Sequence, residues 1–454
     1  MAEDALPILG FGKVQTRKGD NERPEDGCAQ MKIGYILLDG CADRPSPQLN
    51  FTTPLEAAYT PNLDEVARRS NLGRVVTVGR GVAPESDIAV FNMLGYSFEK
   101  GYPGRGVIEA VGCGLEVRPG DLALRANLAS AKGRRIVDRR AGRNLTQQEA
   151  VRLAEGLNSI RLEGAVLEFR ATISYRGVLV IKADKPLSAD ISNTDPAYAK
   201  VRGFGAAKPT VNGESVLAAR PESETVAARR AADLVNEFTA KSAKVLSESA
   251  VNSERLREGK LPANCVLLRD AGDHVPEVES FKEKYGMKGT ALVEMPAEVG
   301  IAKILRMKMV AVEDRDDMKE KATLFTRELC EGTAVYVHIK GPDEFGHDGD
   351  AVGKKRAIEV IDRNFFSVVA DRVGNMKVGV SCDHSTPCTI RMHASDPVPL
   401  LISTDSKGDG MRFTEAGSKK GSLGTIRGRD VLRLIAESGQ RPGLLTLRRK
   451  RYLS

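Results

Sequence analysis

The stretch VYVHIKGPDEFGHDGD, residues 335–350, decides how the chain is expected to fold. Its first five residues are apolar, β-branched or aromatic, apart from one histidine, and predict a short buried β-strand. A polar loop with aspartates, a glutamate and His347 follows Gly341 and Pro342. Carboxylates around a histidine are candidate metal ligands, and one helical turn would bring Asp343 and His347 together. An acidic surface loop with an incidental histidine is the alternative for this stretch alone.

The same pattern recurs at KIGYILLDG (residues 32–40) and KVGVSCDHSTPC (residues 377–388). Continuous apolar runs of this kind are typical of strands buried on both faces of a parallel sheet. Because they alternate with amphipathic helices, the chain is expected to be α/β, with a doubly wound, mostly parallel sheet. In such sheets function collects outside the carboxyl ends of the strands. We therefore expect Asp39, Asp343 and Asp383 to lie together.

The chain has only five histidines, so their positions are informative. Three of them lie in the predicted loops: His347, His384 and His393. His338 lies inside a predicted strand and is interpreted as a core histidine with satisfied hydrogen bonds. Cys382 and Cys388 flank the site, but their spacing matches no thiolate motif, so buried small residues are expected rather than zinc ligands.

Ser86 stands at the start of a predicted helix in GRGVAPESDIAVFNMLGY, residues 79–96. Helix N-capping is the common role of serine at such a position. The functional alternative is a nucleophile, because free N–H groups and the helix dipole at an N-terminus would hold a transferred phosphoryl group.

Three carboxylates, three imidazoles and one hydroxyl together supply ligand sets for two divalent cations. Mixed nitrogen and oxygen ligation without sulfur suits Mn²⁺, Co²⁺ or Zn²⁺, and Mg²⁺ is also compatible. Two dications would outweigh the three carboxylates, so the site would attract a phosphate dianion and lower the pKa of a bound hydroxyl.

At 454 residues the chain is expected to form two domains. Residues 115–263 lack strands that end in aspartate and contain hairpin-like text at residues 169–182, so we interpret them as a smaller α+β substrate domain. This domain is inserted into a core formed by residues 31–114 and 264–443. Residues 1–30 are read as an N-terminal extension, and residues 444–454 as a basic tail.

The composition, 41% hydrophobic and 28% charged, is that of a globular protein. A net charge of +7 suits an anionic substrate or a weak polyanion surface without specifying either. The sequence shows no apolar run near the ~20 residues of a membrane span, and no signal-peptide layout at the N-terminus. Scattered cysteines favour a reducing, cytoplasmic location. The charged segment at residues 312–325 is expected to be exposed.

Taken together, the motifs ILLDG with ADRP, TPLEAA, APESDIAVFNMLGY, GDLALRAN, GHDGD, CDHSTPC and SDPVPLLI resemble the archaeal-type cofactor-independent phosphoglycerate mutases, members of the alkaline phosphatase superfamily. The resemblance runs from about residue 32 to residue 443. It implies a metal-binding α/β core with an inserted substrate domain. It also implies interconversion of 3-phosphoglycerate and 2-phosphoglycerate through a phosphoserine, with two divalent metal ions and without 2,3-bisphosphoglycerate.

The resemblance also implies roles for individual residues. Ser86 resembles the phosphorylated nucleophile. One metal would be held by Asp39, Ser86, Asp383 and His384, and the other by Asp343, His347 and His393. The implied substrate anchors are Arg105, Arg125, Arg269 and Asp195, where ordinary surface arginines are the alternative. The chain departs from the family pattern at Asp270, where a glycine is expected.

Two other functions remain open from the sequence. The first is a metal-dependent phosphatase or another phosphotransferase of the same superfamily. The second is a metal-bound, non-catalytic protein that binds a polyanion through its basic tail, although nucleic acid is not the expected partner because aromatic residues do not interleave with the basic ones. The sequence does not indicate an oligomeric state.

Overall fold

The computed structural model describes most of the chain. The described residues are 32–98, 102–201, 204–207, 213–312, 317–330, 332–405 and 407–437. The predicted extension at residues 1–30 and the basic tail at residues 444–454 lie outside them.

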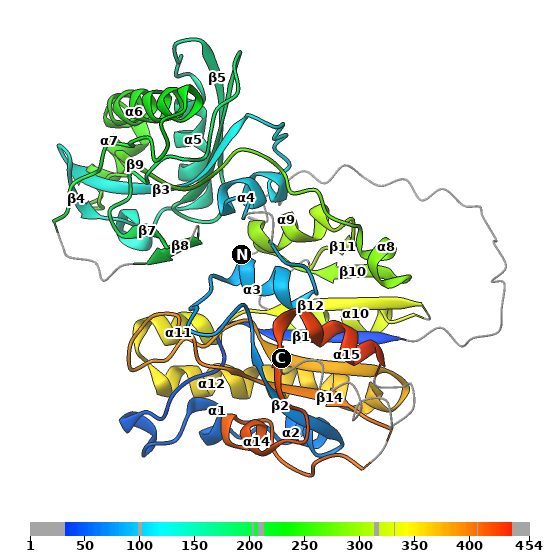
Figure 1. Ribbon diagram of the computed structural model, residues 1–454. Helices are drawn as coiled ribbons and strands as arrows, with labels where there is room; N and C mark the ends of the chain where they lie inside the picture. The colour runs from blue at the N-terminus through cyan, green and yellow to red at the C-terminus, as the bar shows by residue number, and fades with distance from the viewer. Residues whose placement is uncertain are drawn as a thin grey trace.

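A mostly parallel sheet of eight strands forms the larger part of the described molecule (Figure 1). Its order is β11-β10-β12-β1-β13-β14-β2-β15. Only β14 runs antiparallel to both of its neighbours. The sheet confirms the predicted α/β class. Its strands are β1 (Ile33–Leu38), β2 (Ser70–Val76), β10 (Lys288–Leu292), β11 (Lys308–Val310), β12 (Thr333–Ile339), β13 (Lys377–Cys382), β14 (Val398–Ser403) and β15 (Gly424–Arg427).

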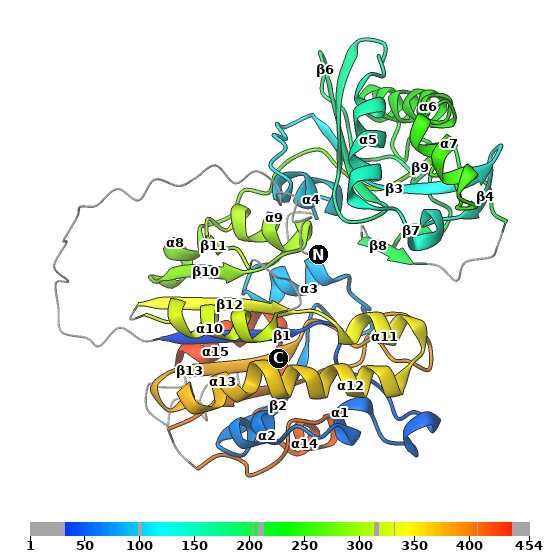
Figure 2. The same cartoon turned by 180° about the vertical axis from the view of Figure 1, so that it is seen from behind.

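Helices cover both faces of this sheet, which explains why its central strands are apolar throughout. Figure 2 shows α10 and α12 in front of the sheet, with α15 behind it. All six residues of β1 are buried. The helices of this part are α1 (Pro54–Ala57), α2 (Pro61–Arg68), α3 (Ser86–Met93), α8 (Phe281–Tyr285), α9 (Pro296–Ile304), α10 (Met318–Glu328), α11 (Pro342–Asp348), α12 (Ala351–Ile361), α13 (Ser367–Val369), α14 (Glu415–Lys420) and α15 (Val431–Glu437). A further helix, α4 (Arg105–Gly112), packs against α9 and against strands of the second sheet.

The expectation that residues 312–325 are exposed is wrong for the helical part. Helix α10 buries Ala322, Leu324 and Phe325, and also Lys321, which pairs with Glu294. The Phe325 ring lies on Gly34 of β1, where a Cβ would be only 2.7 Å from the Phe325 Cζ atom. A charged segment with apolar residues at helical spacing is thus an amphipathic core helix.

A second, antiparallel sheet lies apart from the first, with strand order β4-β3-β6-β5 and β9 paired to β3 (Figure 1). It confirms the hairpin predicted at residues 169–182, which is the β5–β6 pair. A separate hairpin joins β7 to β8. The elements of this part are β3 (Leu122–Lys132), β4 (Arg135–Asp138), β5 (Ala165–Ala171), β6 (Arg176–Ala183), β7 (Tyr198–Val201), β8 (Phe204–Ala207), β9 (Cys265–Gly272), α5 (Gln147–Asn158), α6 (Val226–Ser247) and α7 (Ala250–Arg257).

The position of β9 corrects the sequence interpretation. Because its sequence is apolar, β9 was expected to belong to the core unit that resumes at residue 264. In the structure it pairs with β3 of the antiparallel sheet. The reason is that α6 and α4 pack against it, so all eight of its residues are buried although its sheet is antiparallel. We therefore propose that the inserted unit extends to the end of β9.

Helix α4 joins the two parts by packing against both α9 and β3. Its Gly112 crosses α9 so closely that a Cβ there would lie 1.9 Å from the carbonyl oxygen of Pro296. A Cβ added at Gly106 would likewise lie 2.4 Å from the carbonyl oxygen of Ala123 in β3. Residues on α4 are therefore held in a fixed position relative to the antiparallel sheet.

Replacing Phe325 with alanine is expected to lower the free energy of unfolding by about 3–5 kcal/mol, because a fully buried ring would leave a cavity over Gly34. Urea denaturation followed by circular dichroism measures the change. Thr323→Ala, on the exposed side of the same helix, is the matched control and should change the value by less than about 0.5 kcal/mol. Equal effects of the two substitutions would contradict the packing of α10 on β1.

Candidate active site

Three neighbouring parallel strands bring the predicted acidic loops together. Strand β1 pairs with β12 and β13, and Leu38 is in register with Ile339 and Cys382. The next residue of β1 is Asp39 and that of β13 is Asp383, so the two carboxylates leave the sheet at the same level. Helix α11 begins two residues beyond β12 and carries Asp343.

The first cluster gathers around the imidazole of His384. Its Nε2 atom lies 3.1 Å from Asp383 Oδ2, 3.6 Å from Asp39 Oδ1 and 3.0 Å from Ser86 Oγ. Asp39, Asp383 and His384 are all buried, and their ligand atoms lie close enough for one metal ion. The structure therefore brings together all four residues predicted for one metal.

The second cluster lies beside the first. The i and i+4 spacing on α11 places His347 Nε2 3.4 Å from Asp343 Oδ2, as predicted. His393 Nε2 is 3.2 Å from His347 Nε2 and 3.7 Å from Asp343 Oδ1. His384 also belongs here by geometry, because its ring stacks on His393 at 3.8 Å between centroids. His384 thus lies between the two predicted ligand sets and contacts both of them.

Hydrogen bonds orient all three imidazoles in the same way. The Nδ1 atoms of His347 and His393 lie 3.2 Å and 2.8 Å from the carbonyl oxygens of Arg391 and Pro84. A carbonyl oxygen can only accept, so each Nδ1 carries the proton and each Nε2 lone pair faces the site. His384 Nδ1 lies 3.0 Å from the hydroxyl of Thr386.

The Thr386 hydroxyl donates its proton to Asp343 Oδ1 at 2.6 Å. It can therefore only accept from His384 Nδ1, so in the neutral ring the Nε2 lone pair of His384 also faces the site. Imidazoles fixed in this tautomer are prepared for metal binding.

The Ser86 hydroxyl does not cap its helix. Helix α3 begins at Ser86, and its N-cap is Glu85, which makes no side-chain capping bond. The hydroxyl instead faces His384 Nε2 at 3.0 Å. Of the two interpretations of Ser86, the geometry thus favours the functional one over simple capping.

The electrostatics of the site fit bound cations. Asp383 Oδ1 accepts backbone N–H groups from Gly40 and His384, whereas Asp383 Oδ2 and Asp39 Oδ1 are buried and accept no hydrogen bond. Burial raises the pKa of Asp39 to about 6, and the Asp383 carboxylate adds to this rise while Lys340 opposes it. Buried, uncompensated acceptor oxygens of this kind are what a divalent cation would satisfy.

Three residues behind the first cluster were not identified from the sequence. His338, expected to be an ordinary core histidine, donates from Nδ1 to the Glu298 carboxylate at 2.9 Å and aims Nε2 at Asp383 Oδ2, 3.5 Å away. Lys340 Nζ lies 3.0 Å from Asp39 Oδ2 and pairs with Glu298. The place of Lys340 directly after β12 was a usable signal, whereas nothing in the sequence pointed to Glu298.

A buried lysine ties the loops of the site together. Lys354 of α12 is fully buried, and its Nζ binds Asp43 Oδ2 at 2.8 Å and the carbonyl oxygen of Thr386 at 2.9 Å. Asp43 follows Asp39 in the loop after β1, and Thr386 follows β13. This ion pair therefore fixes the two loops that carry the first cluster.

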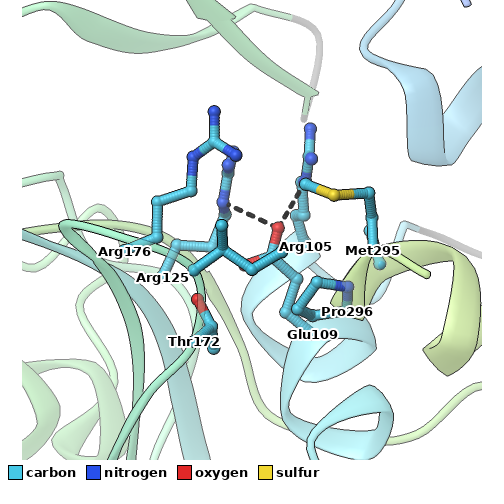
Figure 3. Close-up of a pocket in the computed structure, with 9 residues that line it drawn as sticks. Arg105, Glu109, Arg125, Thr172, Arg176, Met295 and Pro296 are labelled. Atoms are coloured by element: carbon cyan, nitrogen blue, oxygen red, sulfur yellow. Dashed lines mark hydrogen bonds and ion pairs between the residues drawn. The ribbon is translucent and has the colours of Figure 1, made fainter. Parts of the chain in front are cut away.

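The predicted anchors Arg105 and Arg125 are not ordinary surface residues. Glu109 of α4 bridges them, at 2.8 Å from Arg105 Nε and 3.0 Å from Arg125 Nε. Arg105 Nη1 also binds Glu85 at 3.0 Å, and Glu85 directly precedes Ser86. Burial alone would raise the pKa of Glu85, but His393, Arg105 and Arg125 together lower it to about 2, so this carboxylate lies between the histidines and the arginines. Figure 3 shows Arg105 and Arg125 on either side of Glu109.

The other two predicted anchors form a separate cluster on β9 and its neighbours. Arg269 binds Asn127 Oδ1 at 3.1 Å and Asp195 Oδ2 at 3.3 Å, and its guanidinium group stacks on Tyr198. Asp195 is fully buried and also pairs with Arg139. Asp195 is therefore neutralised by two guanidinium groups and presents no free carboxylate.

Asp270 explains why a glycine is expected at its position. Its φ is +56°, in the left-handed region that glycine adopts without strain. Its carboxylate lies 3.4 Å from Arg125 Nη1 and 3.5 Å from Arg269 Nε. The departure from the family pattern thus adds a negative charge that links two predicted anchors.

Comparison with known proteins agrees with this fold. A family model described as 2,3-bisphosphoglycerate-independent phosphoglycerate mutase matches residues 67–252. A protein of that name from Aeropyrum pernix is 44% identical, over 88% of this chain and 97% of its own length.

Two solved structures are also similar. A protein from Pyrococcus horikoshii has a TM-score of 0.72 at 27% identity, covering 90% of this chain and 97% of the other. A cofactor-independent phosphoglycerate mutase from Thermoplasma acidophilum has a TM-score of 0.57 at 31% identity, covering 90% and 99%. These matches define the class as phosphoglycerate mutase, an isomerase. Within that class, the chain belongs to the 2,3-bisphosphoglycerate-independent family.

In the described part of the chain, no helix has the length and apolar character needed to cross a membrane.

Lys354→Met is expected to lower the free energy of unfolding by about 3–5 kcal/mol, because the Asp43 carboxylate would stay buried without its partner. Thermal or urea denaturation measures the loss. Lys355→Met is the matched control, since Lys355 makes only a partly exposed pair with Glu359 and should cost at most about 1 kcal/mol. A loss at Lys354 no greater than at Lys355 would contradict the role of this ion pair.

Proposed function

We propose that this enzyme interconverts 3-phosphoglycerate and 2-phosphoglycerate through a phosphoserine on Ser86, with two divalent cations. The observation that carries the proposal is the position of the Ser86 hydroxyl, 3.0 Å from His384 Nε2 at the edge of both clusters. The family to which the chain belongs supports phosphoglycerate as its substrate. The substrate is small and anionic, in agreement with the basic net charge.

The two clusters would each hold one cation. Asp39, Ser86, Asp383 and His384 would hold the first, and Asp343, His347 and His393 the second. The donor set, nitrogen and oxygen without sulfur, suits Mn²⁺, Co²⁺, Zn²⁺ or Mg²⁺. Cations bound there would lower the pKa of the Ser86 hydroxyl and neutralise the phosphoryl oxygens.

The residues of the chain orient the reaction. Ser86 is the first residue of α3, so its Oγ lies beside the free N–H groups of the first helical turn, which can bind phosphoryl oxygens. A bond forms between Ser86 Oγ and phosphorus as the ester bond of the substrate breaks, and the proton that Ser86 Oγ loses ends on the released glycerate oxygen. The other hydroxyl of glycerate then attacks the phosphoserine, the Ser86 Oγ–phosphorus bond breaks, and the proton of that hydroxyl returns to Ser86 Oγ.

Between the two steps glycerate must stay bound. Arg105 and Arg125 would hold its carboxylate, since guanidinium groups bind carboxylates at two points. Arg269 and Asp195 are proposed to complete this side of the site. The antiparallel sheet that carries Arg125 and Arg269 would also keep water from the phosphoserine.

The free cysteines of the described chain agree with a reducing, cytoplasmic setting.

Ser86→Ala is expected to abolish turnover of 3-phosphoglycerate, because the phosphoryl group would have no acceptor. The assay couples 2-phosphoglycerate formation to its dehydration, with no 2,3-bisphosphoglycerate added. Ser253→Ala, at an exposed position on α7, is the control and should retain full activity. Mass spectrometry of the wild-type enzyme with substrate should find phosphate on Ser86. A Ser86→Ala enzyme that still turns over would disprove the mechanism.

Asp343→Asn is expected to weaken binding of the second cation at least about 10-fold, because a carboxylate ligand becomes neutral. Titration calorimetry with Mn²⁺ measures the affinity, and removal of metal with a chelator should stop turnover until metal is restored. Glu344→Gln, an exposed acid one position along α11, is the matched control and should bind normally. Equal affinities in the two variants would exclude Asp343 as a ligand.

A phosphatase is the alternative outcome of the same chemistry. It would be recognised by release of inorganic phosphate from 3-phosphoglycerate faster than isomerisation. Membership of the mutase family favours isomerisation.

A further inference from the structure

A pocket beside the candidate active site contains Arg176, an arginine outside the predicted set of substrate anchors. The pocket is a small, partly open recess where α4 and the start of α9 meet the β5–β6 turn. Arg176 is the first residue of β6 and points into it, next to Arg125 (Figure 3). The residues that line the pocket are Arg105, Glu109, Arg125, Thr172, Ile173, Arg176, Met295, Pro296 and Ala297.

The strand register explains how Arg176 reaches this place. Arg176 is paired with Asn127 of β3, two residues from Arg125, so Arg176 and Arg125 lie diagonally on the same face of the sheet. Strand β9 pairs with the other edge of β3, and its Arg269 is directly opposite Arg125. Three adjacent strands thus place three guanidinium groups in one row, and like charges so arranged repel each other unless an anion lies among them.

The carboxylates in the row do not neutralise Arg176. Glu109 binds Arg105 and Arg125, and Asp270 lies between Arg125 and Arg269. The Arg176 guanidinium lies 5.5 Å from the centroid of the Tyr175 ring and helps to lower the pKa of the Tyr175 hydroxyl and of the Glu109 carboxylate. Among the described residues it forms no ion pair within 4.0 Å with a carboxylate, since Glu109 pairs with Arg105 and Arg125. The pocket therefore has a cationic group available for a ligand.

The pocket is connected to the nucleophile through Arg105. Arg105 lines the pocket and also binds Glu85, the residue before Ser86. A phosphoglycerate has two anionic ends, and its phosphoryl end is proposed to lie at Ser86. Its carboxylate then needs cationic partners on the side away from the metal clusters, where Arg176 stands.

We propose that Arg176 binds the carboxylate of phosphoglycerate, together with Arg105 and Arg125, and so selects phosphate esters that carry a carboxylate. This inference rests on the proposed function. The guanidinium fork binds a carboxylate at two points, and Arg176 has no carboxylate partner of its own, whereas Arg105 and Arg125 are already paired with Glu109.

The test compares Arg176→Gln with Arg118→Gln in the full-length, metal-loaded enzyme. Arg118 is an exposed arginine in the segment between α4 and β3, and it lies outside the pocket. Arg176→Gln is expected to raise the KM for 3-phosphoglycerate about 10- to 100-fold, with kcat changed much less, because a charge-assisted bond to the bound substrate is lost. The Ki of inorganic phosphate, which has no carboxylate, should change less than about twofold. Arg118→Gln should leave both constants unchanged.

Two results would overturn the inference. One is a KM in Arg176→Gln equal to that of Arg118→Gln. The other is a rise in the phosphate Ki by the same factor as the KM, which would place Arg176 at the phosphoryl end. If the melting temperature shows that Arg176→Gln does not fold, Arg176→Lys serves instead, and its KM should still rise severalfold because lysine cannot bind at two points. A wild-type enzyme without turnover of 3-phosphoglycerate would instead disprove the proposed function itself.

Discussion

The parallel register of β12, β1 and β13 is the constraint on which the rest of the structure depends. Backbone hydrogen bonds align Ile339, Leu38 and Cys382, so the polar residues after them emerge side by side. A slip of one residue would turn every side chain of a strand to the opposite face of the sheet. Close packing of particular side chains, such as the Phe325 ring on Gly34, opposes such a slip, and the sheet thereby fixes the positions of groups that are themselves polar.

That alignment concentrates negative charge in a region shielded from water. Asp39, Asp343 and Asp383 approach one another, and Lys340 and His338 offset only part of their repulsion. The imidazoles are held at Nδ1 by carbonyl or hydroxyl oxygens, so they offer lone pairs rather than protons. The ligand atoms of Asp39, Asp383 and His384, and those of Asp343, His384 and His393, thus lie close enough together to form two candidate cation sites.

The sequence was sufficient for the central sheet and for the clustering of the site. Apolar runs that end in aspartate identify parallel strands, and the topology of such a sheet then brings Asp39, Asp343 and Asp383 together. It was not sufficient for β9, because an apolar strand covered by helices on both faces looks the same in either sheet. It also could not place Arg176 or Glu298, since their roles follow from register and from contacts across the chain that leave no local pattern. His338 is buried in its strand as expected, but a strand position does not tell that Glu298 and Asp383 face its ring.

The close crossing of α4 and α9 limits how this protein can evolve. A Cβ at Gly112 would overlap the backbone of α9, and one at Gly300 would lie 1.9 Å from the carbonyl oxygen of Ile108 on α4. Neither helix can accept even alanine at these positions without moving apart from the other. Sequence drift in this region is thus confined to the outer surfaces of the two helices, and the seam between them is expected to remain glycine in any descendant that keeps the same arrangement.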